Sequence, residues 1–436
     1  MRRSRLVACG AALVLLVAGC GDDDGGGGGG GSSGSEQSGS TEGAKVIDLK
    51  SMEGAKGEVT YCTGKDTTGE TKDWTKRFNA KFADQGLEAK VVEFPASADE
   101  QRNQFVQRQE AKSGDCDVFY SDVIWTAEFA SQGWLYDMGP YVKDREQELI
   151  PSTVETVKFD GRTWGMPKQT DSAFLYYRSD QIDTPPDTWQ QVYELAAQEN
   201  GIVYQGASYE GLTCDFLEIA FAAGGRVLSD DGKEAQFDSP ENVAALQFMV
   251  DGIKNGAAPK AVTTYMEEPA RQAFESGDVT FMRNWPYAYA LGLEAPKIKG
   301  KFDVAPLPSW EGGEAASILG GHNLVISAFS ENPGAALKLI DYMTSEEIQK
   351  RAFTKFSLAP TIAAIYDQPD VKKVRPFAPE QKQAVEQAQP RPVSPVYPQI
   401  SQAIYKNVNQ ALSGQMSPEE AVKQAQSDIE DALATF

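Results

Sequence analysis

The stretch EVTYCTGKDTTGETKDWTKRFNAKFADQGLEAKVVEFPASADEQRNQFVQRQEAKSGDCDVFY, residues 58–120, contains the pattern that best predicts the fold class. Three short apolar-rich runs in it are typical of strands: Glu58–Tyr61, Lys90–Phe94 and Asp117–Tyr120. The segments between them, residues 71–82 and 99–113, have the length of helices, and aromatic residues recur in the first at every fourth position: Trp74, Phe78 and Phe82. Strands separated by such helices predict a parallel sheet and an α/β chain.

Further along the chain, helix starts are marked by a capping residue followed by proline. The pairs are Ser239-Pro240, Asn332-Pro333 and Ser417-Pro418, and the last one continues with Glu419-Glu420 as a capping box. A proline-rich turn over residues 184–188 precedes another expected helix. The chain is therefore expected to be α/β throughout and to have more than one lobe.

The first 45 residues indicate where the protein works. A basic start is followed by an apolar run over residues 6–17, which ends in Val17-Ala18-Gly19-Cys20. This layout is typical of a secretory signal peptide, and the small residues before Cys20 resemble a bacterial lipobox, in which the cysteine becomes the lipidated N-terminus. Residues 20–45 are rich in Gly, Ser and Asp and predict a disordered linker.

We therefore expect residues 1–19 to be a lipoprotein signal peptide, and the mature chain to be anchored through Cys20 on the outer face of the plasma membrane. The alternative is an ordinary signal peptide with a chance cysteine. Loss of the three signal arginines changes the formal net charge from −22 to −25. Such an acidic chain is not expected to bind nucleic acid or anionic lipid, because phosphate binding needs clustered Lys and Arg.

The cysteines and histidine restrict the possible chemistry. Three cysteines remain after Cys20: Cys62, Cys116 and Cys214. A Cys62–Cys116 bridge suits an oxidising compartment. Against it, Cys62 lies late in one expected strand and Cys116 opens another, so parallel neighbours would hold them too far apart, and the pattern favours separate thiols. His322 is the only histidine, which disfavours a structural zinc site or a His-rich metal site.

Polar and aromatic residues gather where a ligand site is expected, beyond the carboxyl ends of strands. Asp122 and Asp171 follow strand-like runs, Trp285 and Tyr287 lie in an aromatic segment, and Arg391 lies between prolines. Carboxylates and Arg suit the hydroxyl edges of a sugar, and flat aromatic rings suit its C–H faces. For each residue alone, a structural role competes: a helix cap for Asp, a core position for an aromatic such as Trp125, and a locked loop for Arg391.

The whole mature chain resembles family 1 extracellular solute-binding proteins of ABC importers, and within them the trehalose/maltose-binding type. The resemblance is carried by these segments: DVIWTAEFASQGWL (122–135), GRTWGMPKQTDSAFLYYRSD (161–180), PPDTWQQV (185–192), QGASYEGLTCDF (205–216), MRNWPYAY (282–289), LGGHNLVIS (319–327) and RPVSPVYPQIS (391–401). It implies a two-lobe clamp of the type II periplasmic-binding-protein kind, with a hinge of crossover segments.

The resemblance also implies lobes that are discontinuous in sequence. The N-lobe would comprise residues 46–171 plus 319–370, and the C-lobe residues 174–316 plus 371–436. The chain would cross between the lobes near residues 171–173, 317–320 and 370–372.

The function that the resemblance implies is capture of a sugar, such as trehalose, maltose or a related glycoside, by hinge closure and its delivery to the permease of an ABC importer. It implies ligand contacts at Asp122, Asp171, Trp285, Tyr287, Gly320, Gly321 and Arg391, with weaker transfers at Asp66 and Tyr209. It implies no catalytic residue, no cofactor and a monomer. Arg102 matches the family pattern, but a structural ion pair is expected for it.

One departure from the family concerns the ligand. Where the trehalose/maltose type has Gly-Gly-Trp, this chain has Gly320-Gly321-His322, so an imidazole replaces a stacking ring. His322 is therefore a candidate ligand contact that can donate or accept a hydrogen bond, and a polar or acidic sugar derivative becomes an alternative ligand. Two rival functions remain open: a lipid-anchored glycosidase that uses paired carboxylates, and a surface sugar sensor.

Overall fold

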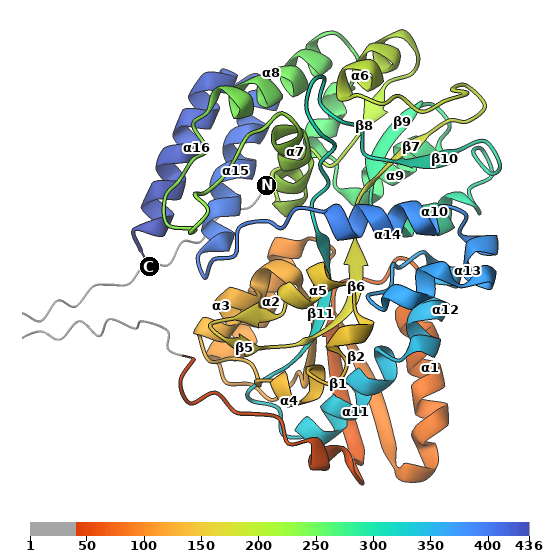
Figure 1. Ribbon diagram of the computed structural model, residues 1–436, viewed down its shortest axis with the longest axis vertical. Coiled ribbons are helices and arrows are strands. Elements are labelled where there is room, and N and C mark those ends of the chain that lie inside the picture. Colours follow the sequence, from red (N-terminus) through yellow and green to blue (C-terminus); the bar gives the residue numbers. More distant parts are fainter. Residues whose placement is uncertain (1–40, 436) are drawn as a thin grey trace, which may run out of the picture. The chain divides into compact units, whose positions relative to one another are not determined.

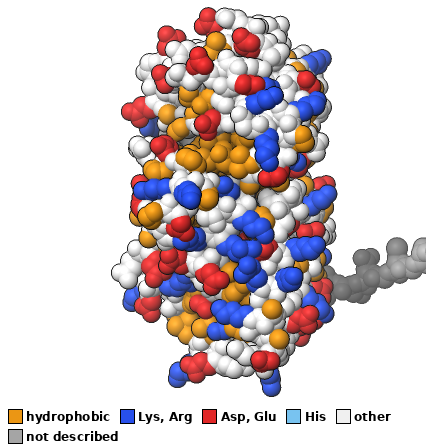
Figure 2. Space-filling model, turned by 90° about the vertical axis from the view of Figure 1, so that its right-hand side faces the viewer, with side chains coloured by type: hydrophobic (Ala, Val, Ile, Leu, Met, Phe, Trp, Pro, Cys, Tyr) orange, Lys and Arg blue, Asp and Glu red, His pale blue; other side chains and the backbone are white. Residues whose placement is uncertain are grey.

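The computed structural model describes residues 41–435. The predicted signal peptide, Cys20 and nearly all of the predicted linker lie outside the described residues. Within residues 41–435, no helix is both long enough and apolar enough to cross a membrane. The described chain forms two lobes, which Figure 1 shows one above the other, and acidic and basic side chains are interspersed over the face shown in Figure 2.

The first lobe is built on a five-stranded sheet with the order β2-β1-β3-β11-β6. Its strands are β1 (Gly57–Thr63), β2 (Leu87–Glu93), β3 (Val118–Asp122), β6 (Met166–Asp171) and β11 (Gly320–Ile326). β1 pairs in parallel with β2 and β3, which confirms the parallel α/β start, whereas β11 is antiparallel to β3 and β6. A small hairpin joins β4 (Lys158–Phe159) to β5 (Arg162–Thr163).

The helices in the sequence range of the first lobe fall into two sets. The first set is α1 (Glu70–Phe82), α2 (Ala98–Glu110), α3 (Thr126–Ser131), α4 (Gly139–Val142) and α5 (Pro151–Glu155). The second set is α11 (Pro333–Met343), α12 (Glu346–Phe356), α13 (Pro369–Val374) and α14 (Ala378–Gln387). In α1, the predicted face of Trp74, Phe78 and Phe82 is buried in the lobe core.

The second lobe is built on a four-stranded sheet with the order β10-β7-β9-β8. Its strands are β7 (Phe174–Tyr177), β8 (Ile202–Val203), β9 (Phe281–Asn284) and β10 (Asp303–Pro306). Its helices are α6 (Trp189–Gln198), α7 (Glu210–Ala222), α8 (Pro240–Lys254), α9 (Glu267–Glu275), α10 (Tyr287–Gly292), α15 (Tyr397–Leu412) and α16 (Pro418–Leu433). α7, α8, α15 and α16 lie together on one side of this lobe (Figure 1).

The predicted helix starts are confirmed. The side chain of Ser239 accepts a hydrogen bond from Asn242 N at the start of α8, and that of Asn332 accepts one from Ala335 N at the start of α11. Ser417 and Glu420 form the predicted capping box of α16. These local caps set the starts of α8 and α16 in the second lobe and of α11 in the first.

The prediction about the cysteines is wrong. Cys62 and Cys116 form a disulfide, and their Cα atoms lie 5.8 Å apart. The reason is that Cys116 is not part of a strand: β3 begins at Val118, which pairs with Tyr61. The chain bends just before β3, at Asp115 and Asp117, so Cys116 stays near Cys62 instead of extending away along the sheet. Among the described cysteines, Cys214 is buried and free.

Within the described residues, the chain passes between the two cores in three segments: at Ser172, between Ile318 and Leu319, and over residues 389–395. Val371, Ala378 and Val385 pack in the first core, whereas Phe377 packs in the second, so α13 and α14 contact both cores. Ser317 joins the three segments: Ser172 Oγ donates to Ser317 Oγ at 2.9 Å, and Gln389 N donates to Ser317 O at 2.8 Å.

Candidate functional site

A cavity of about 260 Å³ lies between the two lobes, close to the lower end of the range of about 300–1,000 Å³ that is usual for small-molecule sites. Every residue that the sequence singled out as a ligand contact lines it: Asp66, Asp122, Asp171, Tyr209, Trp285, Tyr287, Gly320, Gly321, His322 and Arg391. The first-lobe wall comes from the ends of β1, β3 and β6 and the start of β11. The second-lobe wall comes from the starts of α7, α9 and α10.

Two aspartates of the first-lobe wall also act as local caps. Asp66 Oδ1 accepts from the N–H groups of Thr68 and Gly69, and its Oδ2 accepts from Thr71 N, all at 2.9 Å. Asp122 Oδ1 accepts from Ile124 N at 3.2 Å at the start of a short 3-10 helix. Each aspartate therefore both caps a local turn and lines the cavity. Most of the hydrogen-bonding capacity of the Asp66 carboxylate is taken up by N–H groups of its own loop.

Asp171 ends β6 at the point where the chain leaves the first lobe. Its Oδ2 accepts from Gln169 Nε2 at 2.9 Å, and Gln169 Oε1 in turn accepts from Tyr120 OH at 2.6 Å. Its Oδ1 has no hydrogen-bond partner among the described residues. Burial raises the pKa of Asp171 to about 7, so the side chain holds a proton more readily than an exposed aspartate.

His322 forms a flat ring stack with Tyr120. The ring centroids lie 3.9 Å apart and the planes differ by 5°. The stack follows from register, because β11 is antiparallel to β3 and pairs His322 with Asp122, two residues from Tyr120. Burial lowers the pKa of His322 to about 4, so the imidazole is uncharged at neutral pH. It is then a neutral hydrogen-bonding surface at the cavity edge.

The two glycines before His322 are required by close contacts. A Cβ on Gly321 would lie 2.3 Å from Gln169 O, and Gly321 has φ +118°, a conformation that other residues rarely adopt. A Cβ on Gly320 would lie 3.1 Å from Cζ3 of Trp285. Because Gly320 has no side chain, the ring of Trp285 in the second lobe can lie close to the start of β11 in the first.

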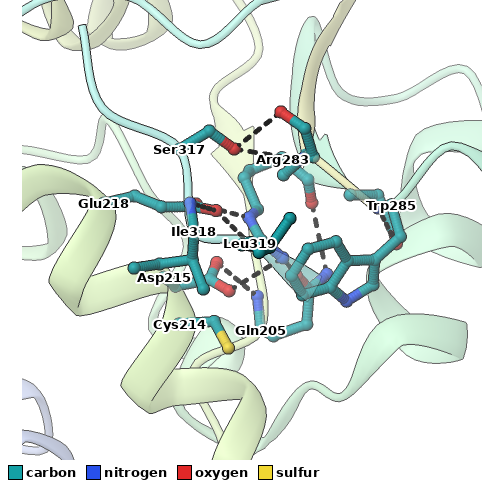
Figure 3. Close-up of polar contacts among 12 residues, drawn as sticks. Gln205, Cys214, Asp215, Glu218, Arg283, Trp285, Ser317, Ile318 and Leu319 are labelled. Atoms are coloured by element: carbon teal, nitrogen blue, oxygen red, sulfur yellow. Dashed lines mark hydrogen bonds and ion pairs between the residues drawn. The ribbon is translucent and has the colours of Figure 1, made fainter. Parts of the chain in front are cut away.

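Trp285 rests on a buried charged cluster that the sequence analysis missed (Figure 3). The guanidinium carbon of Arg283 lies 4.0 Å from the centroid of the Trp285 ring. Arg283 donates to both carboxylate oxygens of Glu218 at 2.7 and 2.6 Å and to Gln205 Oε1 at 2.7 Å. Asp215 Oδ2 lies 3.2 Å from the same guanidinium. The neighbouring carboxylates raise the pKa of Arg283, which therefore stays charged despite its burial.

Arg391 links the two walls. Its Nη1 donates to Glu210 Oε1 at 2.7 Å in the second lobe, and its Nη2 donates to Asp122 Oδ1 at 3.2 Å in the first. Glu210 also accepts hydrogen bonds from Tyr397 and Ser401. Arg391 thus locks its loop and lines the cavity at once.

The sequence did contain a signal for the residues that were missed. Glu210, Cys214 and Glu218 recur at every fourth position of α7, so they share one face of a helix that is almost wholly buried. Arg283 is a charged residue within the buried strand β9. Buried charges of opposite sign require each other, which could have indicated the pairing of α7 with β9.

The remaining aromatic contacts lie beside carboxylates. Tyr287 OH donates to Glu268 Oε1 at 2.8 Å. Tyr209 lies next to Glu267, and burial raises its pKa well above the usual value. Arg102 does not line the cavity and pairs with Glu128 at 2.7 Å, which confirms the expected structural ion pair. The described residues hold no group of three or more His, Cys, Asp or Glu side chains arranged to bind a metal ion.

Two lobes that enclose a cavity lined by hydrogen-bonding and aromatic side chains define a binding protein of the clamp class. The chain belongs to the bacterial extracellular solute-binding protein family, whose sequence model matches residues 64–350. A Probable ABC transporter-binding protein of Deinococcus radiodurans is 35% identical over 387 residues, which cover 84% of this chain and 91% of that protein.

Solved structures support the same assignment. Maltose-bound MalE3 of T. maritima matches with a TM-score of 0.81 and 39% identity, covering 86% of this chain and 99% of that one. A solute-binding protein of an ABC transporter from Thermotoga lettingae, bound with α-D-tagatose, matches with a TM-score of 0.77 and 27% identity at the same coverage.

Proposed function

We propose that this protein captures a sugar between its lobes and delivers it to the permease of an ABC importer. The ligand class is an α-linked disaccharide, such as maltose or trehalose, or a related glycoside. The observation that carries the proposal is the lining of one cavity by carboxylates and Arg391 beside Trp285 and Tyr287, drawn from both lobes. The likeness to a maltose-bound relative at 39% identity supports this ligand class.

Capture follows from the two-walled geometry. A sugar touches both walls only when the lobes are closed, so its binding shifts the equilibrium toward the closed form. Charge-assisted hydrogen bonds from the aspartates and Arg391 would hold hydroxyl groups, and the Trp285 ring would cover a C–H face. The closed, loaded form would then dock on the permease.

A thermal-shift screen tests the ligand class. Trehalose, maltose, sucrose, longer oligosaccharides and acidic sugar derivatives are added to the purified protein one at a time. A ligand at about 100 times its Kd stabilises the folded state by about 2.7 kcal/mol, so a true ligand raises the melting temperature clearly. A shift with an α-linked disaccharide supports the proposal, and a shift with acidic sugars alone redirects it toward His322 as the specificity determinant.

The site assignment needs its own test. Asp122→Ala, Trp285→Ala and Arg391→Ala should each weaken binding of the sugar found in the screen, as measured by calorimetry. Equal affinity in all three variants and in the wild type would overturn the assignment of these residues to the ligand.

The rival functions are separated by product and uptake assays. A glycosidase would release monosaccharide from a disaccharide during incubation, whereas the proposed binding protein returns the sugar intact. A sensor would bind sugar without supporting import, so deletion of the gene would leave sugar uptake unchanged. Loss of uptake on deletion supports the transport role.

The membrane anchor is a separate proposal. Lipidation of Cys20 would keep the protein on the outer face of the plasma membrane. Cys20→Ser should release the protein into the medium, and mass spectrometry of the wild-type N-terminus should find a diacylated cysteine. An unmodified cysteine in the mature protein would leave an ordinary signal peptide with a chance cysteine.

A further inference from the structure

We infer that Asp99, which does not line the cavity, is an inter-lobe cap that stabilises the closed arrangement of the protein. Asp99 lies in the first turn of α2, in the first lobe. Its Oδ2 accepts from the backbone N–H of Glu210, the first residue of α7 in the second lobe, at 3.1 Å. The inference deepens the proposed function, because closure is the step by which a ligand would be captured.

The start of α7 lacks a cap from its own lobe. Tyr209 occupies the N-cap position and makes no side-chain capping hydrogen bond. The first N–H groups of a helix have no partner within the helix, so a nearby acceptor stabilises them. Asp99 provides that acceptor for Glu210 across the cleft. The bond exists only while the lobes are together, and their separation leaves the start of α7 uncapped.

The cap is connected to the cavity through Glu210. Asp99 holds the backbone of Glu210, and the side chain of Glu210 accepts from Arg391 at 2.7 Å. Arg391 in turn donates to Asp122 in the first lobe. The contact of Asp99 with α7 therefore supports the same closed geometry as the ion pair of Arg391, but from outside the cavity.

The surroundings of Asp99 favour a hydrogen-bond acceptor at this position, but they disfavour the negative charge of a carboxylate. Burial raises the pKa of Asp99, against the lowering effect of the Glu210 N–H and of Arg102. On α15, burial raises the pKa of Tyr405 to about 12, and the negative charge of Asp99 adds to this. An asparagine, which accepts a hydrogen bond without a charge, should therefore cap α7 at least as well as aspartate does.

The test compares three variants of the purified protein. Asp99→Ala removes the acceptor, Asp99→Asn keeps one, and Glu100→Ala is the matched control, because Glu100 is an exposed acid in the same turn of α2. Spin labels on Glu110→Cys in the first lobe and Lys406→Cys in the second report the distance between the lobes without any ligand. Maltose affinity is measured by calorimetry.

We expect Asp99→Ala to widen the ligand-free distance distribution and to weaken maltose binding about fivefold, the usual effect of losing a helix cap. Asp99→Asn and Glu100→Ala should match the wild type or, for the asparagine, close more fully. The inference is overturned if Asp99→Ala and Glu100→Ala give the same distances. If wild-type protein does not bind maltose, the proposed ligand fails, and the ligand-free distances still decide the role of Asp99.

Discussion

The two walls of the cavity are built in different ways. On the first-lobe wall, Asp66 is held by backbone N–H groups no more than five residues away, and Asp122 caps the turn that follows it. On the second-lobe wall, Trp285 rests on Arg283, whose partner Glu218 is 65 residues distant in the chain. Asp66 and Asp122 of the first-lobe wall are therefore positioned by local loops, whereas Trp285 of the second-lobe wall depends on packing α7 against β9.

The largest expected effect comes from breaking the support of the second-lobe wall. Glu218→Ala leaves the buried guanidinium of Arg283 without its bidentate partner, and loss of one member of a buried ion pair typically costs about 3–5 kcal/mol. Urea denaturation should show this loss in the free energy of unfolding. Glu234→Ala, at an exposed position of the same lobe, is the control. Equal stability of the two variants would contradict a supporting role for the cluster.

The pH dependence of the free energy of unfolding tests the environment of Asp171 in the first-lobe wall. The pKa of Asp171 is raised from 3.8 to about 7 in the folded protein, so between these values the folded state keeps a proton that the unfolded state has released. Stability should therefore fall as pH rises through this window, by about 4 kcal/mol over three pH units. Asp171→Asn should remove this slope. Parallel stability curves for the wild type and the variant would contradict the raised pKa.

Gly321, in β11 beside the cavity, offers a third test. Gly321→Ala places a Cβ 2.3 Å from Gln169 O in a conformation reserved for glycine, and should cost about 3 kcal/mol. Gly86→Ala also has a positive φ but meets no atom within 4 Å, and should cost about 1 kcal/mol. Thermal unfolding of the two variants separates the clash from the backbone strain. Equal losses of stability in the two variants would mean that β6 shifts to accommodate the added carbon at little cost.

The smallest expected effect concerns ligand affinity alone. Trp285→Ala should weaken maltose binding about tenfold, or about 1.4 kcal/mol, because the ring that would cover the sugar is lost. Trp310→Ala is the matched control, since Trp310 packs in the same lobe and does not line the cavity. A similar loss in both variants would indicate a general effect on the second lobe instead of contact with the ligand.

Much of the fold and of the cavity lining could be predicted from the chain. Asp66, just after β1, and Asp122 and Asp171, the last residues of β3 and β6, line the cavity. The disulfide of Cys62 and Cys116 was missed, because it depends on a bend before β3 that strand propensity does not reveal. Arg283 and Glu218 were missed because each alone resembles an ordinary charged residue.

The α/β class, the helix caps and the residue types at the strand ends could be predicted because they follow from short-range patterns of apolar, capping and turn residues. The pairing of distant residues depends on the packing of whole elements: Cys62 with Cys116, Glu218 with Arg283, and Asp99 with the start of α7. The physical reason is that such contacts require two elements to be packed together, and the free energy of that packing is spread over a whole lobe or across the closed cleft, instead of residing in any one segment.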